Sequence, residues 1–368
     1  MRLDAVELVR ARIDLVAPFR ASHGVQAHRE LLFVRAVGDE EGWGECVAMN
    51  SPGYTAESID TAERAMRERL LPLLRSGTTA ESFMSAAGPH PGDPMAKTAV
   101  ETALLDLELR TRGESLAAHL GAVRDRVPSG VAVGIHEDDD SLIATVRGHL
   151  EQGYVRIKMK IEPGRDVGPV RAVRAEFGDD VVLQVDANGA YSMDDLDTFL
   201  ALDGFGLLLV EQPFAAHDLV SHAALRARIA TPVCLDESLD SFDAVARALE
   251  AGACDIVCVK PARLGGISVA QRVHDLCVRE SIPMWAGGML ETGIGRAALL
   301  AVAAMPGFTI PGDTSASDRY FTRDVTEPFV LRDGFIDVPR GPGIGVRPLA
   351  SVLDPLVVSR DTFTVAAP

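Results

Sequence analysis

The chain has 368 residues, 47% of them hydrophobic, and a net charge of −17. A chain of this length and composition buries a large core and predicts two domains, or one domain with a barrel. The negative charge argues against nucleic acid and anionic membranes as partners, because phosphate binding requires a basic face. Apolar runs stay below the roughly 18 residues of a membrane span, and the charged start, MRLDAVELVR, is unlike a signal peptide. The five cysteines form no CxxC pair, so we expect a cytoplasmic protein with buried free thiols.

The first part of the chain has the patterns of an α+β domain. Residues 4–16 and 29–37 alternate apolar and polar side chains, as antiparallel strands do. The sequence GWGEC follows, and residues 56–73 and 95–112 then show helical periodicity, which predicts two amphipathic helices. The tail, residues 331–368, lacks this periodicity, and we expect it to rejoin the first domain.

From about residue 127, short apolar segments alternate with helical ones that start after Ser, Asp or Gly and end near Gly. Eight strands are predicted, the number of a closed parallel barrel. They lie at 127–135, 154–161, 181–188, 206–213, 231–238, 255–261, 282–289 and 307–313. The predicted architecture is therefore a (β/α)8 barrel over residues 127–330, with a capping domain of residues 1–126 that residues 331–368 complete.

Five successive strands end in an ionisable residue at nearly constant spacing. Lys160, Asp186, Glu211, Asp236 and Lys260 follow one another at intervals of 24 to 26 positions. One βα unit has about this length, so the five residues occupy equivalent places on neighbouring strands. We expect them to converge at the carboxyl ends of the strands, where barrel enzymes have their active sites.

The three acidic residues of this set need a counter-charge, because carboxylates in a poorly solvated site raise one another's pKa. Oxygen ligands with no His or Cys nearby indicate Mg²⁺ or Mn²⁺ rather than zinc. Lys160 and Lys260 would then face each other across a metal-bound carboxylate substrate. Lys158 shares a strand face with Lys160, where its charge would lower the proton affinity of Lys160 and its ammonium would contact an anionic substrate oxygen. This set favours removal of a proton from the carbon next to a carboxylate, with metal stabilisation of the enediolate.

Three other features have weaker interpretations. Asn188 and Glu237 adjoin predicted ligands and are either groups behind those ligands or simple helix caps. The sequence TGIGRAA at 292–298, followed by Asp313, imitates the G-x-G-x-x-A fingerprint of dinucleotide sites. Because it occurs late in the run of βα units, we favour a Gly-rich turn before a helix whose free N–H groups face the active site and could hold a carboxylate.

The motifs KMK, VDAN, VEQP, LDES and VKPARLGG carry the five spaced residues. Together with GWGEC, GGMLETGIGRAALLA and PGDTSASDRYF, they resemble the muconate-lactonising subgroup of the enolase superfamily over the whole chain. Within it the sequence is similar to o-succinylbenzoate synthases and N-succinylamino acid (N-acylamino acid) racemases. The resemblance implies a modified TIM barrel of the (β/α)7β type with an α+β capping domain, and an isomerase, a carbon–oxygen lyase, or both. A dipeptide epimerase, a muconate-type cycloisomerase and a catalytically inactive binding protein remain as alternatives.

The resemblance also implies roles for individual residues. Asp186, Glu211 and Asp236 would ligate Mg²⁺, and Lys160 and Lys260 would be the acid/base pair, one on each face of the α-carbon. In the synthase reaction, Lys160 would remove the proton while Lys260 stabilises the intermediate as a cation. The residues implied in substrate binding are Lys158, Asn188, Arg263, Gly288, Met289, Phe19, Met49 and Tyr54, with Glu237 and Asp313 behind the first layer of the site.

Two positions depart from the pattern of the relatives. His23 lies in the capping loop where an apolar residue is expected, and Ala132 stands on the first barrel strand where a small hydroxyl residue is common. Both affect the fit of the substrate rather than the proton-transfer groups. The resemblance further implies a small-molecule carboxylate as the only substrate partner and a homo-oligomer, commonly an octamer among relatives.

Overall fold

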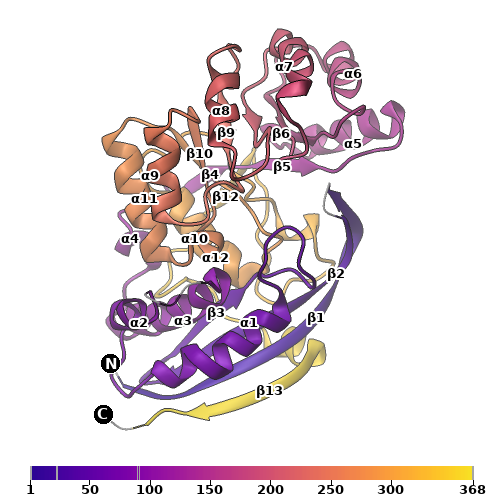
Figure 1. Ribbon diagram of the computed structural model, residues 1–368. Helices are drawn as coiled ribbons and strands as arrows, with labels where there is room; N and C mark the ends of the chain where they lie inside the picture. The colour runs from indigo at the N-terminus through magenta and orange to yellow at the C-terminus, as the bar shows by residue number, and fades with distance from the viewer. Residues whose placement is uncertain (1, 22–23, 89, 91, 367–368) are drawn as a thin grey trace.

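In the computed structural model, which describes residues 2–21, 24–88, 90 and 92–366, an antiparallel and a parallel sheet lie next to each other (Figure 1). The antiparallel sheet has the strand order β13-β1-β2-β3. The predicted strands at 4–16 and 29–37 are confirmed and extend further at both ends. The strands of this sheet are β1 (Leu3–Ala21), β2 (Gly24–Gly38), β3 (Glu41–Cys46) and β13 (Val357–Thr364).

The helices of the N-terminal part differ from the prediction in two ways. The helix expected at 56–73 is a succession of an α-helix, a π-helical turn and a 3-10 turn. The helix expected at 95–112 is not amphipathic, because it packs against both β3 and α10 and buries Lys97, Glu101 and Asp106 with its apolar residues. The bounds are α1 (Ile59–Ala65), η1 (Met66–Leu70), η2 (Leu71–Leu73), α2 (Ala80–Ala87, which the sequence did not predict), α3 (Pro94–Arg112) and α4 (Leu116–His119).

The parallel sheet confirms seven of the eight predicted barrel strands, in the order β11-β10-β9-β8-β7-β6-β5. Chain order and spatial order agree, as expected when every strand is followed by a crossover to its neighbour. The strands are β5 (Gly130–Val133), β6 (Arg156–Lys160), β7 (Leu183–Asp186), β8 (Val210–Glu211), β9 (Val233–Leu235), β10 (Ile256–Val259) and β11 (Met284–Ala286).

The eighth predicted strand, at 307–313, is wrong as a strand. This segment makes only isolated bridges, from Phe308 to Met284 of β11 and from Gly312 to Ser129 next to β5. Pro311 has no N–H to donate to a ladder, and its carbonyl accepts hydrogen bonds from the guanidinium of Arg156 instead. The segment nevertheless occupies the eighth position around the barrel, because it contacts both edges of the seven-stranded sheet.

Helices surround the barrel and several begin at the side-chain caps that the sequence indicates. Asp138, Asp218 and Ser241 each accept a hydrogen bond from the backbone N–H three residues later, which satisfies a free donor of the first helical turn. The helical segments are α5 (Asp139–Gln152), α6 (Val167–Phe177), η3 (Met193–Asp195), α7 (Leu196–Leu202), η4 (Asp203–Phe205), α8 (Leu219–Arg226), α9 (Phe242–Glu250), α10 (Pro261–Leu264), α11 (Ile267–Arg279), α12 (Gly293–Ala303) and η5 (Ser317–Arg319).

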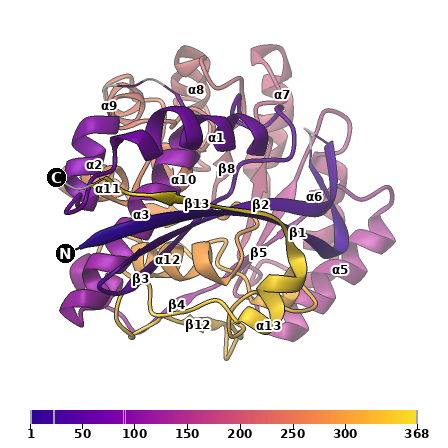
Figure 2. The same cartoon turned by 90° about the horizontal axis from the view of Figure 1, so that it is seen from below.

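The C-terminal tail pairs with earlier parts of the chain. β13 runs antiparallel to β1, and β12 (Phe335–Asp337) pairs with β4 (Arg126–Pro128), while α13 (Ala350–Leu353) and η6 (Asp354–Leu356) lie between them in the chain. Figure 2 shows β1, β2 and β13 crossing the nearer side of the molecule, with barrel helices behind them. The division into domains at residues 126 and 331 stays a prediction.

One hydrophobic cluster connects the two sheets. It contains Phe33 of β2, Ala99 of α3, Val259 of β10 and Leu300 of α12, together with their buried neighbours. The shared core fixes the antiparallel sheet and its helices against the barrel, on the side where the active-site strands end. Among the described helices, none combines the length and the apolar character that crossing a bilayer requires.

We expect Phe199→Ala to lower the free energy of unfolding by about 3–5 kcal/mol, because it empties a closely packed aromatic site. Phe199 is fully buried and packs edge-to-face on Tyr191 and Phe214, with ring centroids 5.1 and 5.5 Å away. Its neighbour on α7, Leu200, is 46% exposed, so Leu200→Ala should change the free energy by less than about 0.5 kcal/mol. Urea denaturation measures both, and equal losses would contradict the packing described.

Candidate active site

Three of the four lysines of the chain line one cavity at the ends of the barrel strands. Lys158 and Lys160 alternate on β6, so the predicted shared face is confirmed, and Lys260 follows β10. Three strands separate β6 from β10 in the sheet. With segment 307–313 as the eighth position, these two strands lie on opposite sides of the barrel. Lys160 and Lys260 therefore enter the cavity from opposite walls.

The three predicted metal ligands come from the three strands between these walls, and all are fully buried. The parallel register places Lys160 beside Asp186 and Asp186 beside Glu211. Glu211 lies beside Cys234, so Asp236 is two residues further along its strand than exact equivalence would place it. The nearly constant spacing therefore predicts the right strands and the right end of the barrel, but not the exact level of every side chain.

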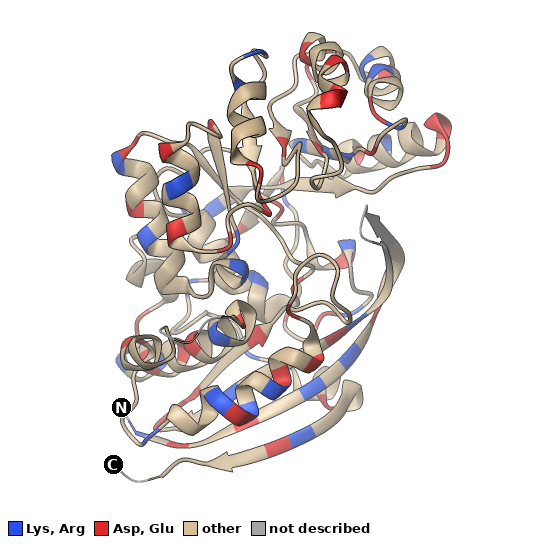
Figure 3. Cartoon of the chain, viewed as in Figure 1, with Lys and Arg blue, Asp and Glu red and all other residues tan. Residues whose placement is uncertain are grey.

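Each of the three carboxylates forms an ion pair with a lysine. The Nζ of Lys160 lies 2.6 Å from Oδ2 of Asp186, and the Nζ of Lys260 lies 2.8 Å from Oδ2 of Asp236. The Nζ of Lys158 contacts both Asp186, at 3.3 Å, and Glu211, at 3.2 Å. Acidic and basic residues are also interspersed along the outer helices (Figure 3). The site is thus an internally neutralised set of charges.

The charge state of the lysines follows from these ion pairs. Burial alone would lower the pKa of Lys158, but the carboxylates of Asp313 and Glu211 outweigh it and raise the pKa well above its ordinary value. The pKa of Lys260 is raised in the same way, with Asp236 as the largest attraction against burial. The carboxylates around Lys158 therefore favour its protonated form. The sequence did not predict this effect.

Tyr54 connects the N-terminal part to the barrel site. Its hydroxyl accepts a hydrogen bond from Nζ of Lys260 at 2.7 Å, donates to Oδ2 of Asp236 at 3.0 Å, and also contacts the guanidinium of Arg263. Arg263 pairs with the second oxygen of Asp236. Burial favours the neutral form of Asp236, but Arg263 and Lys260 overcome this and hold its pKa well below the usual range. Tyr54 and Arg263 therefore lie next to the second lysine, and their predicted role in substrate binding stays a prediction.

Asn188 and Glu237 join the same network on the Lys160 side. The side-chain oxygen of Asn188 accepts from Nζ of Lys160 at 2.7 Å, and its amide group donates to Oε1 of Glu237 at 2.7 Å. Asn188 has φ of 44°, and its backbone N–H donates to Asp186. Neither residue is the N-cap of a described helix, so the geometry supports the interpretation as groups beside and behind the predicted ligands.

Several residues that were predicted to bind the substrate line a cavity of about 60 Å³. Gly288, Met289, Met49 and Ala132 line it as the sequence and the resemblance imply, and so does Asp313, which was expected behind the site. His23 and the side chain of Phe19 lie outside the described residues. The lining residues that were not predicted are Gln26, Leu290 and Tyr320. They are single uncharged residues with no repeating spacing, so no sequence signal identified them.

Two further residues of the site were missed. Arg156 lies two positions before Lys158 on the same strand face, and its guanidinium is 2.9 Å from Oδ1 of Asp313; the alternation of β6 contained this signal. Gln212 accepts hydrogen bonds from the backbone N–H groups of Asp236, at 2.9 Å, and Ser238, at 3.1 Å. Gln212 therefore fixes the backbone that carries the third acidic residue.

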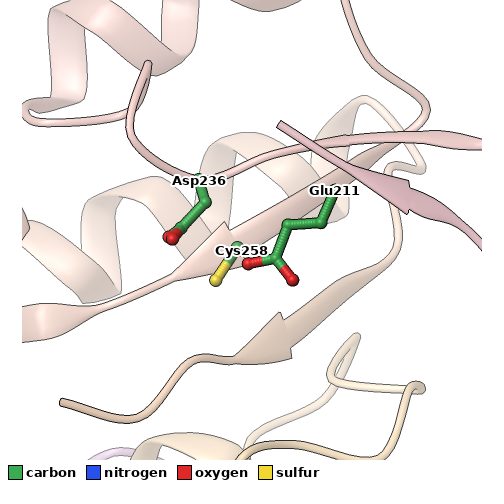
Figure 4. Close-up of side chains that lie close together, drawn as sticks. All are labelled: Glu211, Asp236 and Cys258. Atoms are coloured by element: carbon green, nitrogen blue, oxygen red, sulfur yellow. The ribbon is translucent and has the colours of Figure 1, made fainter. Parts of the chain in front are cut away.

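The expectation that no Cys lies near the acidic residues is wrong. Among the described residues, ligand atoms of Glu211, Asp236 and Cys258 lie within 4.8 Å of one another (Figure 4). Cys258 precedes Lys260 by two positions, so strand alternation turns its thiol into the barrel as well. Asp186 is outside this group and is paired with Lys160. The buried acidic side chains can hold a metal ion, and their oxygen atoms suit a hard divalent cation.

The N-terminus of α12 is occupied by carboxylates of the protein itself. The N–H of Gly293 donates to Asp324 at 2.8 Å, and those of Thr292 and Gly295 donate to Glu45 at 3.0 and 2.8 Å. These N–H groups would have to be free to bind a pyrophosphate. The dinucleotide interpretation of TGIGRAA therefore has no support, and the N–H groups expected to face a ligand are already satisfied.

Comparisons with known proteins extend over nearly the whole chain. A family model described as "Enolase C-terminal domain-like" matches residues 141–352. The N-succinylamino acid racemase of Amycolatopsis sp. is 53% identical, with 98% of this chain and 99% of that protein covered. The o-succinylbenzoate synthase of Bacillus subtilis is 38% identical, with 99% of both covered. A solved structure of an enolase superfamily member from Listeria innocua has a TM-score of 0.94 at 36% identity, with 98% of this chain and 99% of that one covered.

We expect Asp313→Asn to lower the free energy of unfolding by about 3–5 kcal/mol, because it leaves the buried cations Arg156 and Lys158 without their shared partner. These cations hold the pKa of Asp313 well below its usual range against burial. This stabilisation is therefore present above the unfolded pKa, near 3.9, and is lost as the pH falls further. Asp337→Asn, which breaks the exposed pair with Arg332, should cost less than about 0.5 kcal/mol. Equal losses in denaturant titrations would contradict the ion pairing described.

Proposed function

The chain belongs to the enolase superfamily, and we propose that it is a metal-dependent enzyme that removes the α-proton of a carboxylate substrate. The specific activity proposed is that of an N-succinylamino acid racemase, an o-succinylbenzoate synthase, or both. One observation carries the proposal: Lys160 and Lys260 enter one cavity from opposite walls, with three buried carboxylates on the strands between them. The similarity to a racemase and a synthase over nearly the full length supports it.

The opposed lysines suit racemisation because each can serve one face of an α-carbon held between them. One amine takes the proton from its face, and the opposite ammonium returns a proton to the other face, which inverts the centre. In a dehydration, Lys160 would take the proton and Lys260 would remain charged beside the developing anion. Asp186, Glu211 and Asp236 would hold Mg²⁺ or Mn²⁺, which would stabilise the negative charge on the substrate carboxylate as the proton leaves.

The charge balance of the site is consistent with this assignment. Its acidic and basic side chains are equal in number, so the site is neutral before substrate and cation enter when all of them are ionised; burial raises the pKa of Glu211 and of Glu237, and a bound cation would counteract this. A divalent cation adds two positive charges. A substrate carboxylate offsets one of them, and loss of a proton from one lysine offsets the other, so the balance favours a lysine in its basic form. The residues counted are Asp186, Glu211, Asp236, Glu237 and Asp313 against Lys158, Lys160, Lys260, Arg156 and Arg263.

The charges of the cavity favour an anionic substrate. Asp313 is the only described carboxylate that lines it, and this residue is paired with Lys158 at 2.6 Å and with Arg156 at 2.9 Å. The three lysines therefore attract a substrate carboxylate. A dipeptide epimerase stays an alternative, because the reacting residue of a dipeptide also carries an acylated nitrogen.

Location and assembly complete the proposal. We propose that the enzyme acts in the cytoplasm, in keeping with its five cysteines, all of which are buried and reduced. A homo-oligomer, octameric by the resemblance, is proposed as well, and light scattering on the purified protein would test it. An inactive binding protein is the least favoured alternative, because the chain carries all the lysines and acidic residues that the proposed chemistry needs.

We expect Lys160→Ala and Lys260→Ala each to reduce racemisation of N-succinyl amino acids by on the order of 10² to 10⁴-fold, the usual contribution of a general acid or base. In deuterated water, each variant should still exchange the α-hydrogen of the enantiomer that faces its remaining lysine. Lys97→Ala provides the control, because Lys97 is the only lysine outside the cavity and its ammonium contacts the carbonyl of His90. NMR exchange and polarimetry measure the effects, and racemisation near the wild-type rate in either cavity variant would reject the two-base assignment.

We expect Mg²⁺ to bind the metal-free protein and stabilise it by about 2.7 kcal/mol at a concentration 100 times its dissociation constant. Isothermal titration and thermal unfolding in the presence and absence of EDTA would measure this. Asp236→Asn should abolish the stabilisation, whereas Asp240→Asn, at an exposed position four residues later, should keep it. Full stabilisation in the Asp236 variant would exclude this residue as a ligand.

A further inference from the structure

Two buried glutamates of the N-terminal part bind the first turns of two barrel helices. Glu45 of β3 accepts from the N–H of Thr292 at 3.0 Å, the hydroxyl of Thr292 at 2.7 Å and the N–H of Gly295 at 2.8 Å, at the start of α12. Glu101 of α3 accepts in the same way from the N–H groups of Ile267 and Ser268 at the start of α11. Their exposures are 5% and 1%. The two contacts are thus equivalent links between the N-terminal part and the barrel.

The start of α12 depends on such an outside acceptor. The first N–H groups of a helix have no partner within the helix, and the helix dipole favours a negative charge there. Thr292 is the N-cap of α12, yet its side chain accepts no hydrogen bond from its own helix and donates to Glu45 instead. A Cβ on Gly295 would lie 3.0 Å from Oε2 of Glu45, so a glycine here permits the close approach of the carboxylate.

The segment before α12 forms one wall of the substrate cavity. Gly288, Met289 and Leu290 line the cavity directly before this helix. Leu290 has φ of 59°, a left-handed conformation that costs a leucine about 1–2 kcal/mol. Such a conformation persists only when the surroundings enforce it. The carboxylate of Glu291 holds the segment from within, through the N–H of Met289 at 2.7 Å.

A second part of the cavity lining is attached to Glu45 through the chain itself. Met49 lines the cavity and follows Glu45 by only four residues, shortly after β3 ends at Cys46. Glu45 therefore connects the chain near Met49 to the first turn of α12, which follows Met289 and Leu290 in the chain. Its side chain has no described hydrogen bond or ion pair with a cavity lysine.

We propose that Glu45 is a positioning residue that sets the separation of the Met49 wall and the Met289–Leu290 wall, and hence the affinity for the distal part of the substrate. The proposal rests on the proposed function for the identity of that substrate. The N-terminal part would thus hold the pocket wall through the hydrogen bonds of Glu45, in addition to contributing side chains to the cavity. Proton transfer is not affected directly, because the lysines are held by other partners.

The test compares Glu45→Gln with Glu101→Gln. A glutamine at position 45 has only one oxygen for three donors, and its own N–H₂ group then faces a backbone N–H. We expect Glu45→Gln to raise KM for N-succinyl amino acids about tenfold, the effect of losing about one hydrogen bond to a charged group, with kcat changed less than threefold. Hydrogen–deuterium exchange of the amides of residues 288–295 should accelerate by a similar factor.

Glu101→Gln is the matched control, because it weakens an equivalent link to α11, which α10 separates from the cavity residue Lys260 and which does not follow the Met289–Leu290 wall. It should lower the thermal midpoint as Glu45→Gln does, but leave KM and the exchange of residues 288–295 unchanged. An unchanged KM and exchange in Glu45→Gln, or an equal rise of KM in Glu101→Gln, would overturn the proposal.

Thr292→Val provides a second variant if Glu45→Gln does not fold. It removes only the hydroxyl donor and keeps the size of the side chain, so KM and amide exchange should rise by smaller factors in the same direction; no change in either would contradict the proposal. The exchange measurement needs no substrate. A wild-type protein without racemase or synthase activity would refute the proposed function, whereas the exchange comparison would still decide whether Glu45 holds the wall.

Discussion

The pairing of buried carboxylates with lysine ammonium groups is the interaction on which the rest of the site depends. Asp186, Glu211 and Asp236 are fully buried, and ionised carboxylates in such surroundings need opposite charges close by. Lys158, Lys160 and Lys260 supply them at 2.6 to 3.3 Å, with Arg263 added at Asp236. In the proposed function, the groups that neutralise the core of the barrel are the ones that exchange partners when a cation and a carboxylate substrate enter.

The barrel makes this pairing possible by placing charges from different strands at the same end of the sheet. Parallel strands with their crossover helices bring each strand end to the same side of the sheet. The N-terminal part then completes the cavity with Met49 and Tyr54, and its residues Glu45 and Glu101 bind the first turns of α12 and α11. Function and architecture are coupled here because the contacts that join the two parts adjoin the chemical groups.

The sequence by itself determined the features that follow from local periodicity. The strand spacing identified seven barrel strands, their order in the chain and the side at which Lys160, Asp186, Glu211, Asp236 and Lys260 gather, because one βα unit has a nearly fixed length. Strand alternation placed Lys158 on the same face as Lys160. The same alternation also indicates that Arg156 and Cys258 point into the barrel, but neither residue was predicted as part of the site. Helix starts were readable at Asp138 and Ser241 because a cap is a contact over three residues.

Only the tertiary structure decided the features that depend on residues far apart in the chain. Tyr54 and Asp236 share a hydrogen bond across 182 positions, and no spacing rule links them. The same is true of the irregular segment 307–313, whose carbonyl at Pro311 binds Arg156 rather than a neighbouring strand, and of α3, whose burial on both faces requires the barrel helix α10. Periodicity records which face of an element is apolar, but the partner that covers the other face, and the ion pairs that form across it, arise only when the whole chain has folded.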